Sequence, residues 1–428
     1  MPDLTDRILQ IYIWSCLIAL VLYLPRICCY FFAFKKPTKF INDHKNKLAV
    51  IVPAKNESAV IGQCLESLAN QTYDSEMFDT HVVVEDADDP SASIATAFDR
   101  THVHFVPNQL CKGEALDGAL KAILRDDPDK YDAFVIVDAD NVAEPGMLSE
   151  MNNALASGKQ IVCGKKLIKN WMTTRRHHRS FFSNCTALTY TQVDELGNRA
   201  WNVFGAAITM IGTGMMVRTD VIKQIDGWPY RGLTEDYEMT GDAILNGWSS
   251  MYYPFARVFT EEANDARTAF VRRLRWVKGY SQCQRHYAAP IFKKVFARQI
   301  PWWNSLFIIG TYPAYAFFAI SAVAILFGLF DVVISLATGS PGIGPALRML
   351  LMPLGLVYGA LLLFTLISVV AEWPNMKITP FEKAMVLLVG PGYLLGYSRI
   401  FLTSFFTGDD SIPWVPTDRK RLDSGHTG

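Results

Sequence analysis

Long apolar runs stand near both ends of the chain and enclose a polar middle section. Residues Ile8–Phe34 are apolar except for Gln10 and Arg26, and further apolar runs cover Trp302–Phe330 and Leu347–Val370. As a helix, the first run would be roughly 40 Å long, which is enough to cross a hydrocarbon layer about 30 Å thick. The pattern therefore predicts membrane-spanning helices at both ends.

Two of the apolar runs need a further argument. The first is too long for a signal peptide, contains Pro25-Arg26 and is followed by no small-residue cleavage site, so it is predicted to be an uncleaved anchor. A fourth run, Ala384–Phe406, is weaker because Pro391-Gly392 and Arg399 interrupt it. It either spans the membrane or lies as a re-entrant or interfacial segment.

Basic residues flank the polar section on both sides: Lys35, Lys36, Lys39, Lys45 and Lys47 before it, and Lys293, Lys294 and Arg298 at its end. Cytoplasmic flanks are typically basic, so we expect residues 35–301 in the cytoplasm of an integral protein of a bacterial cell membrane. Residues 331–346 contain no Lys or Arg and are predicted to form an external loop. Four spans would leave the C-terminus outside, whereas the basic cluster Arg419–Arg421 favours the cytoplasm, and the sequence leaves this conflict open.

Short apolar runs alternate with helical patterns inside the polar section. The runs Leu48–Val52, His81–Val84, Val103–Val106 and Ala133–Val137 are typical of buried parallel strands. Helical periodicity covers roughly residues 57–70 and 115–124. The alternation predicts an α/β domain with a mostly parallel, doubly wound sheet, which binds ligands at the carboxyl ends of its strands.

Composition narrows the class of protein. Half of the 428 residues are hydrophobic, which excludes a disordered chain. The 41 basic and 41 acidic residues cancel, which argues against a nucleic-acid partner. Eight Cys, three of them in the first apolar run, do not suggest a secreted disulfide scaffold. The 35–301 section holds 32 charges of each sign, so functional electrostatics must come from a local arrangement.

Three carboxylate groups are candidates for chemistry. Glu85-Asp86 follows the second predicted strand, Asp138-Ala139-Asp140 follows the fourth, and Thr234–Asp236 stands further along the chain. Mg²⁺ or Mn²⁺ commonly binds through one or two carboxylates plus substrate phosphates. Taken alone, a group such as Asp138–Asp140 is more typical of a solvated strand end. The third group, taken alone, is more typical of a helix start, with Thr at the cap and acids in the first turn.

The order of seven motifs is more specific than any one of them. The sequence runs Pro53–Glu57, Glu85-Asp86, Lys112–Ala115, Asp138–Asp140, Gly212–Gly214, Thr234–Asp236 and Arg272–Trp276. In this order and spacing, residues 47–285 closely resemble the membrane-embedded family 2 glycosyltransferases, which include cellulose, chitin-oligomer, hyaluronan and poly-N-acetylglucosamine synthases. The resemblance implies four units: an anchor (1–34), a GT-A-type catalytic domain with an interfacial helix (35–301), a C-terminal membrane region with about three spans (302–410) and a tail (411–428).

The resemblance also implies roles for individual residues. Asp236, with Glu235 beside it, matches the general base, and Asp138 and Asp140 match the pair that binds the diphosphate and Mg²⁺ or Mn²⁺. Arg275 and Trp276 match an Arg that faces the diphosphate and a Trp that lines the acceptor site. The residues expected to bind substrate are Pro53, Ala54, Lys55, Glu57, Glu85, Lys112, Gly113, Asp138, Gly214, Arg272, Arg273, Arg275 and Trp276.

Elementary chemistry agrees with these roles. Departure of a nucleoside diphosphate builds negative charge, which a metal and Arg275 would stabilise, and a sugar hydroxyl needs a base such as Asp236. One base and one displacement at the anomeric carbon give inversion. Trp276 offers a flat surface to a sugar ring, although an interfacial aromatic near a membrane is the simpler alternative.

The chain departs from the family pattern at two positions. Glu85 stands where the family usually has Asp, and Arg272 stands where it has Gln. The second departure favours a single addition or an unusual acceptor over processive polymer synthesis. We expect an inverting transferase that moves a sugar from a UDP-sugar to a growing polysaccharide, or to a saccharide or lipid-linked acceptor, with membrane lipids and possible accessory synthase subunits as partners. The alternatives are a non-processive transferase of single sugars and a non-catalytic nucleotide-sugar-binding subunit of a synthase complex.

A basic and histidine cluster, Arg175–Arg179, lies between the second and third carboxylate groups. It could contact donor phosphates, an anionic acceptor or lipid headgroups, but a solvated loop is the favoured interpretation.

Overall fold

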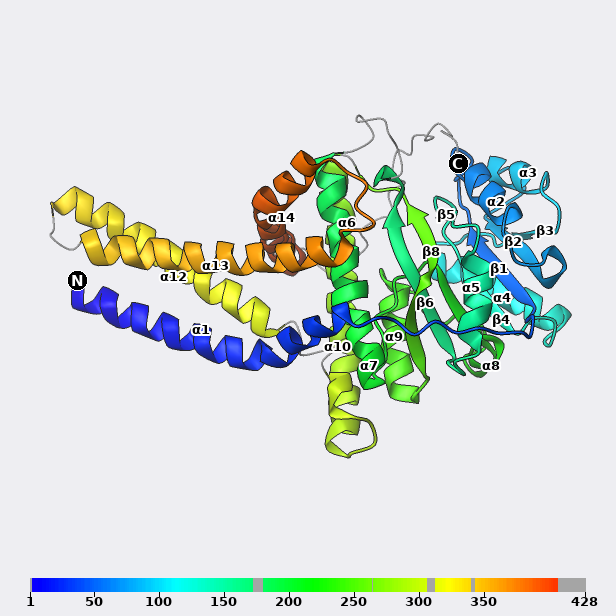
Figure 1. Cartoon of the computed structure of the whole chain (residues 1–428), viewed down its shortest axis with the longest axis horizontal. Coiled ribbons are helices and arrows are strands. Elements are labelled where there is room, and N and C mark those ends of the chain that lie inside the picture. The colour runs from blue at the N-terminus through cyan, green and yellow to red at the C-terminus, as the bar shows by residue number, and fades with distance from the viewer. Residues whose placement is uncertain (1, 172–179, 264, 306–311, 340–342, 407–428) are drawn as a thin grey trace.

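The computed structural model describes residues 2–171, 180–263, 265–305, 312–339 and 343–406. Figure 1 shows a sheet domain at one end of the molecule and long helices that project away from it. The cluster Arg175–Arg179 lies outside the described residues.

The sheet has eight strands in the order β3-β2-β1-β4-β7-β6-β8-β5. Their bounds are β1 Leu48–Pro53, β2 Phe78–Val84, β3 Thr101–Phe105, β4 Ala133–Ile136, β5 Val142–Ala143, β6 Ile161–Ile168, β7 Met215–Arg218 and β8 Ser250–Thr260. The first four strands in this order are parallel, and each overlaps a run that the sequence predicts as a strand. The α/β prediction is confirmed, and the parallel prediction holds for this half of the sheet.

The other half of the sheet is mixed. Strand β7 is antiparallel to both of its neighbours, β4 and β6, whereas β6 and β8 are parallel and β5 is antiparallel to β8. Four of the seven strand pairs are parallel, so the prediction of a mostly parallel sheet holds although this half is mixed.

Side chains of β1 alternate between the two faces of the sheet, as expected for a strand. Ala49 and Ile51 join the apolar cluster that contains residues of α4 (Lys112–Asp126), whereas Leu48, Val50 and Val52 join the one that contains residues of α2 (Ile61–Ala69). Both faces are covered, which explains why the central strands read as continuous apolar runs.

The other helices of the sheet domain are α3 Pro90–Ala95, α5 Met147–Leu155, α6 Phe181–Val193, α7 Arg199–Phe204, α8 Thr219–Gln224, α9 Glu235–Asn246 and α10 Ala266–Phe296. A π-helical turn, Asp194–Asn198, joins α6 to α7. The long helix α10 packs against α9, α6 and α14 (Pro380–Phe406).

Within the described residues, three helical segments are long and apolar enough to cross a membrane: Leu4–Phe34, Pro313–Thr338 and Ile343–Glu372. They correspond to α1 (Pro2–Tyr30) with a following 3₁₀ turn, to α12 (Tyr312–Thr338) and to α13 (Ile343–Glu372). The fourth predicted run forms α14, with Pro391 inside the helix, and it does not join these three. Three spans, rather than about four, therefore have the required length and composition in this part of the chain.

The predicted bounds of the loop 331–346 are wrong, because residues 331–338 continue α12 and residues 343–346 begin α13. Asp331 does not end the helix, since its carboxylate accepts a hydrogen bond from the Thr5 hydroxyl of α1 at 2.6 Å. A buried partner allows a charged group to remain inside a helix bundle.

Candidate active site

The loop after β1 brings the first predicted motif to the carboxyl edge of the sheet. Lys55 Nζ forms an ion pair with Glu85 Oε2 at 2.7 Å and donates to the carbonyl oxygen of Gln109 at 2.9 Å. The Glu57 amide donates to Ser91 Oγ at 3.0 Å. Two strand ends, β1 and β2, are thereby tied together beside a cavity.

Lys112 is the centre of the site's charge network. It opens α4, and its ammonium lies 2.7 Å from Asp138 Oδ1, 3.3 Å from Glu235 Oε1 and 2.5 Å from the carbonyl oxygen of Gly212. Burial alone would lower the pKa of Lys112, but the carboxylates of Asp138 and Glu235 outweigh it and raise the pKa. One lysine therefore links the motifs after β4, before β7 and at the start of α9.

Close packing fixes where Lys112 stands. A Cβ on the next residue, Gly113, would lie 1.8 Å from the carbonyl oxygen of Tyr230, so only glycine allows this approach. Gly113 itself does not line the cavity. Its effect on the site is to position Lys112.

The Asp138–Asp140 turn is held by a side chain that the sequence analysis does not single out. Thr213 Oγ1 accepts the Asp138 amide at 3.0 Å and the Asn141 side-chain amide at 2.6 Å. Asp138 and Asp140 both line the cavity, and the side chain of Asp138 is 35% exposed.

Asp236 lies in the first turn of α9 and faces the same cavity. Burial, followed by repulsion from Glu235, raises its pKa to about 7, while Lys112 and Arg275 act in the opposite direction. Thr234 is the N-cap residue of α9 but makes no side-chain capping bond, so the expected helix-start position is present without the expected hydroxyl cap.

Gly212 makes room for the Asp236 carboxylate. It has a φ of 71°, and a Cβ there would lie 2.9 Å from Asp236 Oδ2. Gly214, predicted from the same motif to bind substrate, packs against Val258 and does not line the cavity.

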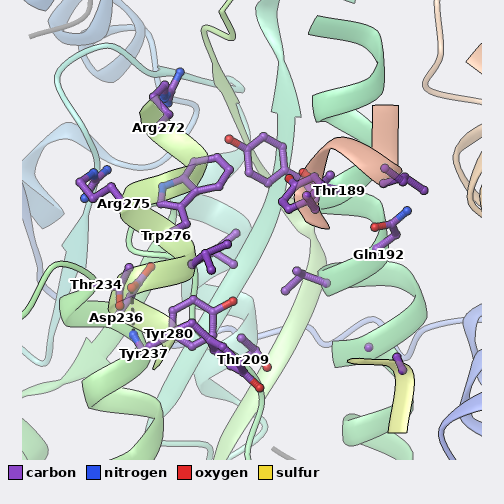
Figure 2. A pocket seen from close by; sticks show the side chains of 18 of the residues that line it. Thr189, Gln192, Thr209, Thr234, Asp236, Tyr237, Arg272, Arg275, Trp276 and Tyr280 are labelled. Carbon is purple, nitrogen blue, oxygen red and sulfur yellow. Dashed lines mark hydrogen bonds between the residues drawn. The ribbon is translucent and has the colours of Figure 1, made fainter. Parts of the chain in front are cut away.

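One face of α10 completes this part of the cavity. Arg272, Trp276 and Tyr280 follow each other at four-residue spacing, and Figure 2 shows Trp276 and Tyr280 pointing into the space that Thr189 and Gln192 of α6 face from the other side. Arg275 donates to the carbonyl oxygen of Leu233 at 2.9 Å, beside the Thr234–Asp236 motif.

Arg272, the departure from the family's Gln, is paired. Its guanidinium lies 3.4 Å from Glu262 Oε2 and 5.7 Å from the centre of the Trp276 ring. Burial would lower the pKa of Arg272, but Glu262 raises it above its usual value. Glu262 also accepts a hydrogen bond from Tyr190, so a buried network holds Arg272 against Trp276.

Most predicted substrate-binding residues line one cavity, but five do not: Ala54, Glu85, Gly113, Gly214 and Arg273. Arg273 is the clearest case, because it donates to Tyr393 and Thr186 between α14 and α6 and lies over the Tyr393 ring. Ala54 belongs to the core behind the sheet edge, and Glu85 approaches the site only through Lys55.

Lys166, at the end of β6, also lines the cavity although no sequence motif includes it. Its ammonium lies 4.4 Å from the centre of the Tyr190 ring, and burial lowers its pKa while Glu262, Asp138 and Asp140 oppose the change. A single lysine within a strand matches no motif, so the sequence does not predict a role for Lys166. Only the fold shows that it lies near Asp138 and Asp140.

The carboxylates of the cavity suit a divalent ion that also binds phosphate oxygens of a substrate. The described residues contain no group of three or more His, Cys, Asp or Glu side chains able to hold a metal alone. Asp138 and Asp140 are two carboxylates at one turn, which matches Mg²⁺ or Mn²⁺ bound partly by substrate phosphates. The residues therefore fit such an ion when a diphosphate is present.

The cavity has a volume of about 1990 Å³ and extends far beyond the carboxylates. Its lining continues from Asp138, Asp236 and Trp276 to residues of α1, α12 and α13. The polar site and the membrane helices therefore share one continuous space.

The chain is similar to known proteins in sequence and in fold. A family model described as "Glycosyltransferase like family 2" matches residues 44–279. The chain is 26% identical over 256 residues to the probable glycosyltransferase YdaM of Bacillus subtilis, an alignment covering 58% of each protein. It is 23% identical over 294 residues to a beta-monoglucosyldiacylglycerol synthase of Trichormus variabilis, covering 65% of this chain and 59% of that protein.

The fold resembles that of the mannosyltransferase PcManGT from Pyrobaculum calidifontis, solved in complex with GDP-Man and Mn²⁺. The TM-score is 0.53 at 16% identity, and the match covers 90% of this chain and 98% of that one. The chain spans less than two thirds of the length of the two curated relatives. The family model, however, covers more than half of the 428 residues and includes every motif from Pro53 to Trp276, so the chain belongs to glycosyltransferase family 2.

Proposed function

We propose that the chain transfers a single sugar from a UDP-sugar to a saccharide or lipid-linked acceptor, with inversion, at the cytoplasmic face of a membrane. The observation that carries this proposal is the position of Asp236. A carboxylate with a pKa of about 7 shares a cavity with two aspartates suited to a metal diphosphate and with three cations, Lys112, Lys166 and Arg275.

In the proposed reaction, Asp236 accepts the proton of the acceptor hydroxyl as its oxygen attacks the anomeric carbon. A base with a pKa near the working pH is both deprotonated often enough and basic enough for this step. The bond from that carbon to the diphosphate oxygen breaks on the opposite side, which inverts the anomeric centre.

The cations have a different task, because charge develops on the departing diphosphate. Arg275 is held by the Leu233 carbonyl oxygen, and Lys112 by Asp138 and Glu235, so neither has to reorganise far to meet that charge. An ion bound by Asp138 and Asp140 would supply Lewis-acid stabilisation of the same oxygens.

A lipid-linked acceptor is supported by the extent of the cavity, which reaches the membrane helices. It also agrees with the name of the Trichormus variabilis relative, whose product is a glucosyl diacylglycerol. A single addition is supported by Arg272, because the buried Glu262 holds this large side chain against Trp276 at the acceptor side.

The test uses the full-length protein in membranes with Mg²⁺ or Mn²⁺ and a panel of UDP-sugars, with GDP-mannose added because the fold neighbour was solved with GDP-Man. We expect nucleotide release with one donor and a product enlarged by one sugar unit. A ladder of product sizes would instead support a processive synthase. Donor binding without turnover for every donor would support the non-catalytic subunit.

A further inference from the structure

The membrane side of the cavity is apolar and open. Its walls come from α1, α12 and α13, and include Ile13, Leu17, Leu20, Phe317, Met352 and Leu363. Leu17, Leu20 and Leu363 are 45%, 52% and 58% exposed. In a bilayer such side chains would meet acyl chains, so this end of the cavity suits the hydrocarbon part of an amphiphile.

One charged side chain of α1, Arg26, lines this apolar region just before the helix ends at Tyr30. Its guanidinium carbon lies 5.1 Å from the centre of the Trp201 ring, and the hydroxyls of Tyr23, Tyr30 and Tyr280 are its electrostatic neighbours. Within the described residues, no carboxylate forms an ion pair with Arg26.

Arg26 borders the cavity together with a residue that has no side chain. Gly197, in the π-helical turn Asp194–Asn198, also lines the cavity, and a Cβ there would lie at contact distance, 3.8 Å from Arg26 Nη2. π-helical turns occur frequently at functional sites. The guanidinium is thus bordered by aromatic rings, hydroxyls and a residue without a side chain.

An arginine near the end of a membrane helix often extends to the water surface, and that is the simplest alternative. Arg26 instead lies against Trp201 of α7, a residue that is 4% exposed. Its side chain is therefore packed against the sheet domain and does not extend to the lipid surface. An arginine without an acidic partner in such a site suits a ligand that brings its own negative charge.

We propose that the membrane end of the cavity binds an amphiphile with a phosphate headgroup, its phosphate at Arg26 and its hydrocarbon chain between α1, α12 and α13. Taking that amphiphile as the acceptor rests on the proposed function. The headgroup lies in the same cavity as Trp276 and Asp236, where an attacking oxygen is required. Arg26 is then the residue that selects anionic over neutral amphiphiles.

Binding of decyl phosphate tests the proposal on the full-length protein in a neutral glycoside detergent, by isothermal titration without donor. Decanol and inorganic phosphate are the comparison ligands. We expect decyl phosphate to bind more tightly than either, and Arg26→Gln to weaken it about tenfold or more, as for loss of a charge-assisted hydrogen bond. Arg26→Lys should retain part of the affinity.

Arg348→Gln is the matched control, because Arg348 near the start of α13 pairs with Asp6 near the start of α1, and its loss should leave decyl phosphate affinity unchanged. Unchanged UDP or GDP binding by Arg26→Gln shows that this variant is folded.

Equal binding of decyl phosphate by Arg26→Gln and the unmodified protein would overturn the proposal, as would equal binding of decanol. Equal binding of inorganic phosphate would show a site for free phosphate and overturn the amphiphile. Because no donor is present, a protein that binds decyl phosphate at Arg26 but transfers no sugar would contradict only the proposed function.

Discussion

At the scale of single residues, burial and neighbouring charges give the carboxylates of the site different properties. Asp138 is ion-paired with Lys112, whereas Asp236 is kept basic by burial and by Glu235. Two carboxylates in one cavity are thus prepared for different tasks, one for a metal diphosphate and one for a proton.

Asp236→Asn should reduce kcat about 10²–10⁴-fold, because the amide cannot accept the proton of the acceptor. Donor affinity should change little, since the carboxylates expected to hold the donor diphosphate, Asp138 and Asp140, follow β4, whereas Asp236 lies in α9. Nucleotide release and donor binding, measured on the same preparation, check both parts. Asp220→Asn, an exposed carboxylate on α8, is the control, and near-normal turnover by Asp236→Asn would contradict the assignment of the base.

The pH dependence of transfer gives a second residue-scale prediction. The pKa of Asp236 is raised to about 7, so the carboxyl is mostly protonated, and inactive as a base, below that pH. kcat should therefore rise about tenfold per pH unit up to about pH 7 and level off above it. The residual activity of Asp236→Asn should lack this inflection, and an inflection that persists in that variant would point to another group.

The motifs in the sequence predict the central residues of the site correctly but are less reliable for the residues beside them. Four residues predicted from the motifs, Lys112, Asp138, Asp236 and Trp276, all line the cavity. Arg273 differs from Arg272 by one position, but successive residues on a helix point about 100° apart, so it faces α14 instead. Arg26 has no sequence motif, since an arginine near the end of an apolar run looks like an ordinary membrane flank.

At the scale of elements, a buried ionic cluster joins the catalytic domain to the membrane helix α13. Lys165 Nζ of β6 lies 2.8 Å from Glu195 Oε1 in the π-helical turn and 2.9 Å from Glu372 Oε1 at the end of α13. Glu195 is also paired with Arg199 and accepts from the Tyr252 hydroxyl at 2.8 Å. The cluster therefore ties the end of α13 to the sheet domain.

Lys165→Met should destabilise the protein by about 3–5 kcal/mol, because it leaves Glu372 buried without its cation. Adding Glu372→Leu should recover part of the loss, since Glu195 keeps Arg199. Chemical unfolding in detergent measures the three free energies. Lys223→Met is the control, because it removes only the exposed ion pair with Asp129 and should cost about 1 kcal/mol or less. An equally small loss of stability in Lys165→Met would contradict the stabilising role of the buried ionic cluster.

The elements themselves differ in how far the sequence reveals them. Strands β1 and β4 are apolar throughout and could be predicted, because burial on both faces removes polar positions. Strand β2 could be predicted only from its second half, because Asp79 and Thr80 interrupt the apolar pattern of its first half. Strands β6 and β8 carry Lys165, Lys166 and Arg257, whose partners lie far away in the chain, so their strand character becomes clear only in the fold. Helix α12 extends past Asp331 for the same reason, since Thr5 of α1 satisfies that carboxylate.

At the scale of the whole molecule, the membrane helices and the sheet domain together line one cavity. The helices are therefore part of the site and not only an anchor for it. Figure 1 shows α1, α12 and α13 projecting from the sheet domain, and the cavity continues from the carboxylates into the space that these helices line. An acceptor held in the membrane could therefore present its polar end to Asp236 without leaving the bilayer completely. Whether the acceptor reaches Asp236 from the membrane side can therefore be tested.

Gly359 of α13 offers a way to close that access without touching the donor site. It lines the cavity, and a Cβ placed on it meets no other group within 4 Å, so a large side chain there would fill open space. Gly359→Trp should lower transfer to an amphiphilic acceptor about tenfold or more, because the indole would occupy the place of the hydrocarbon chain, while donor affinity stays unchanged. Gly344→Trp is the matched control on the same helix, since a Cβ there is equally unobstructed but lies outside the cavity. Equal transfer rates for the two variants would mean that the acceptor reaches Asp236 from the aqueous side, and the membrane helices would then serve only to hold the enzyme at the surface.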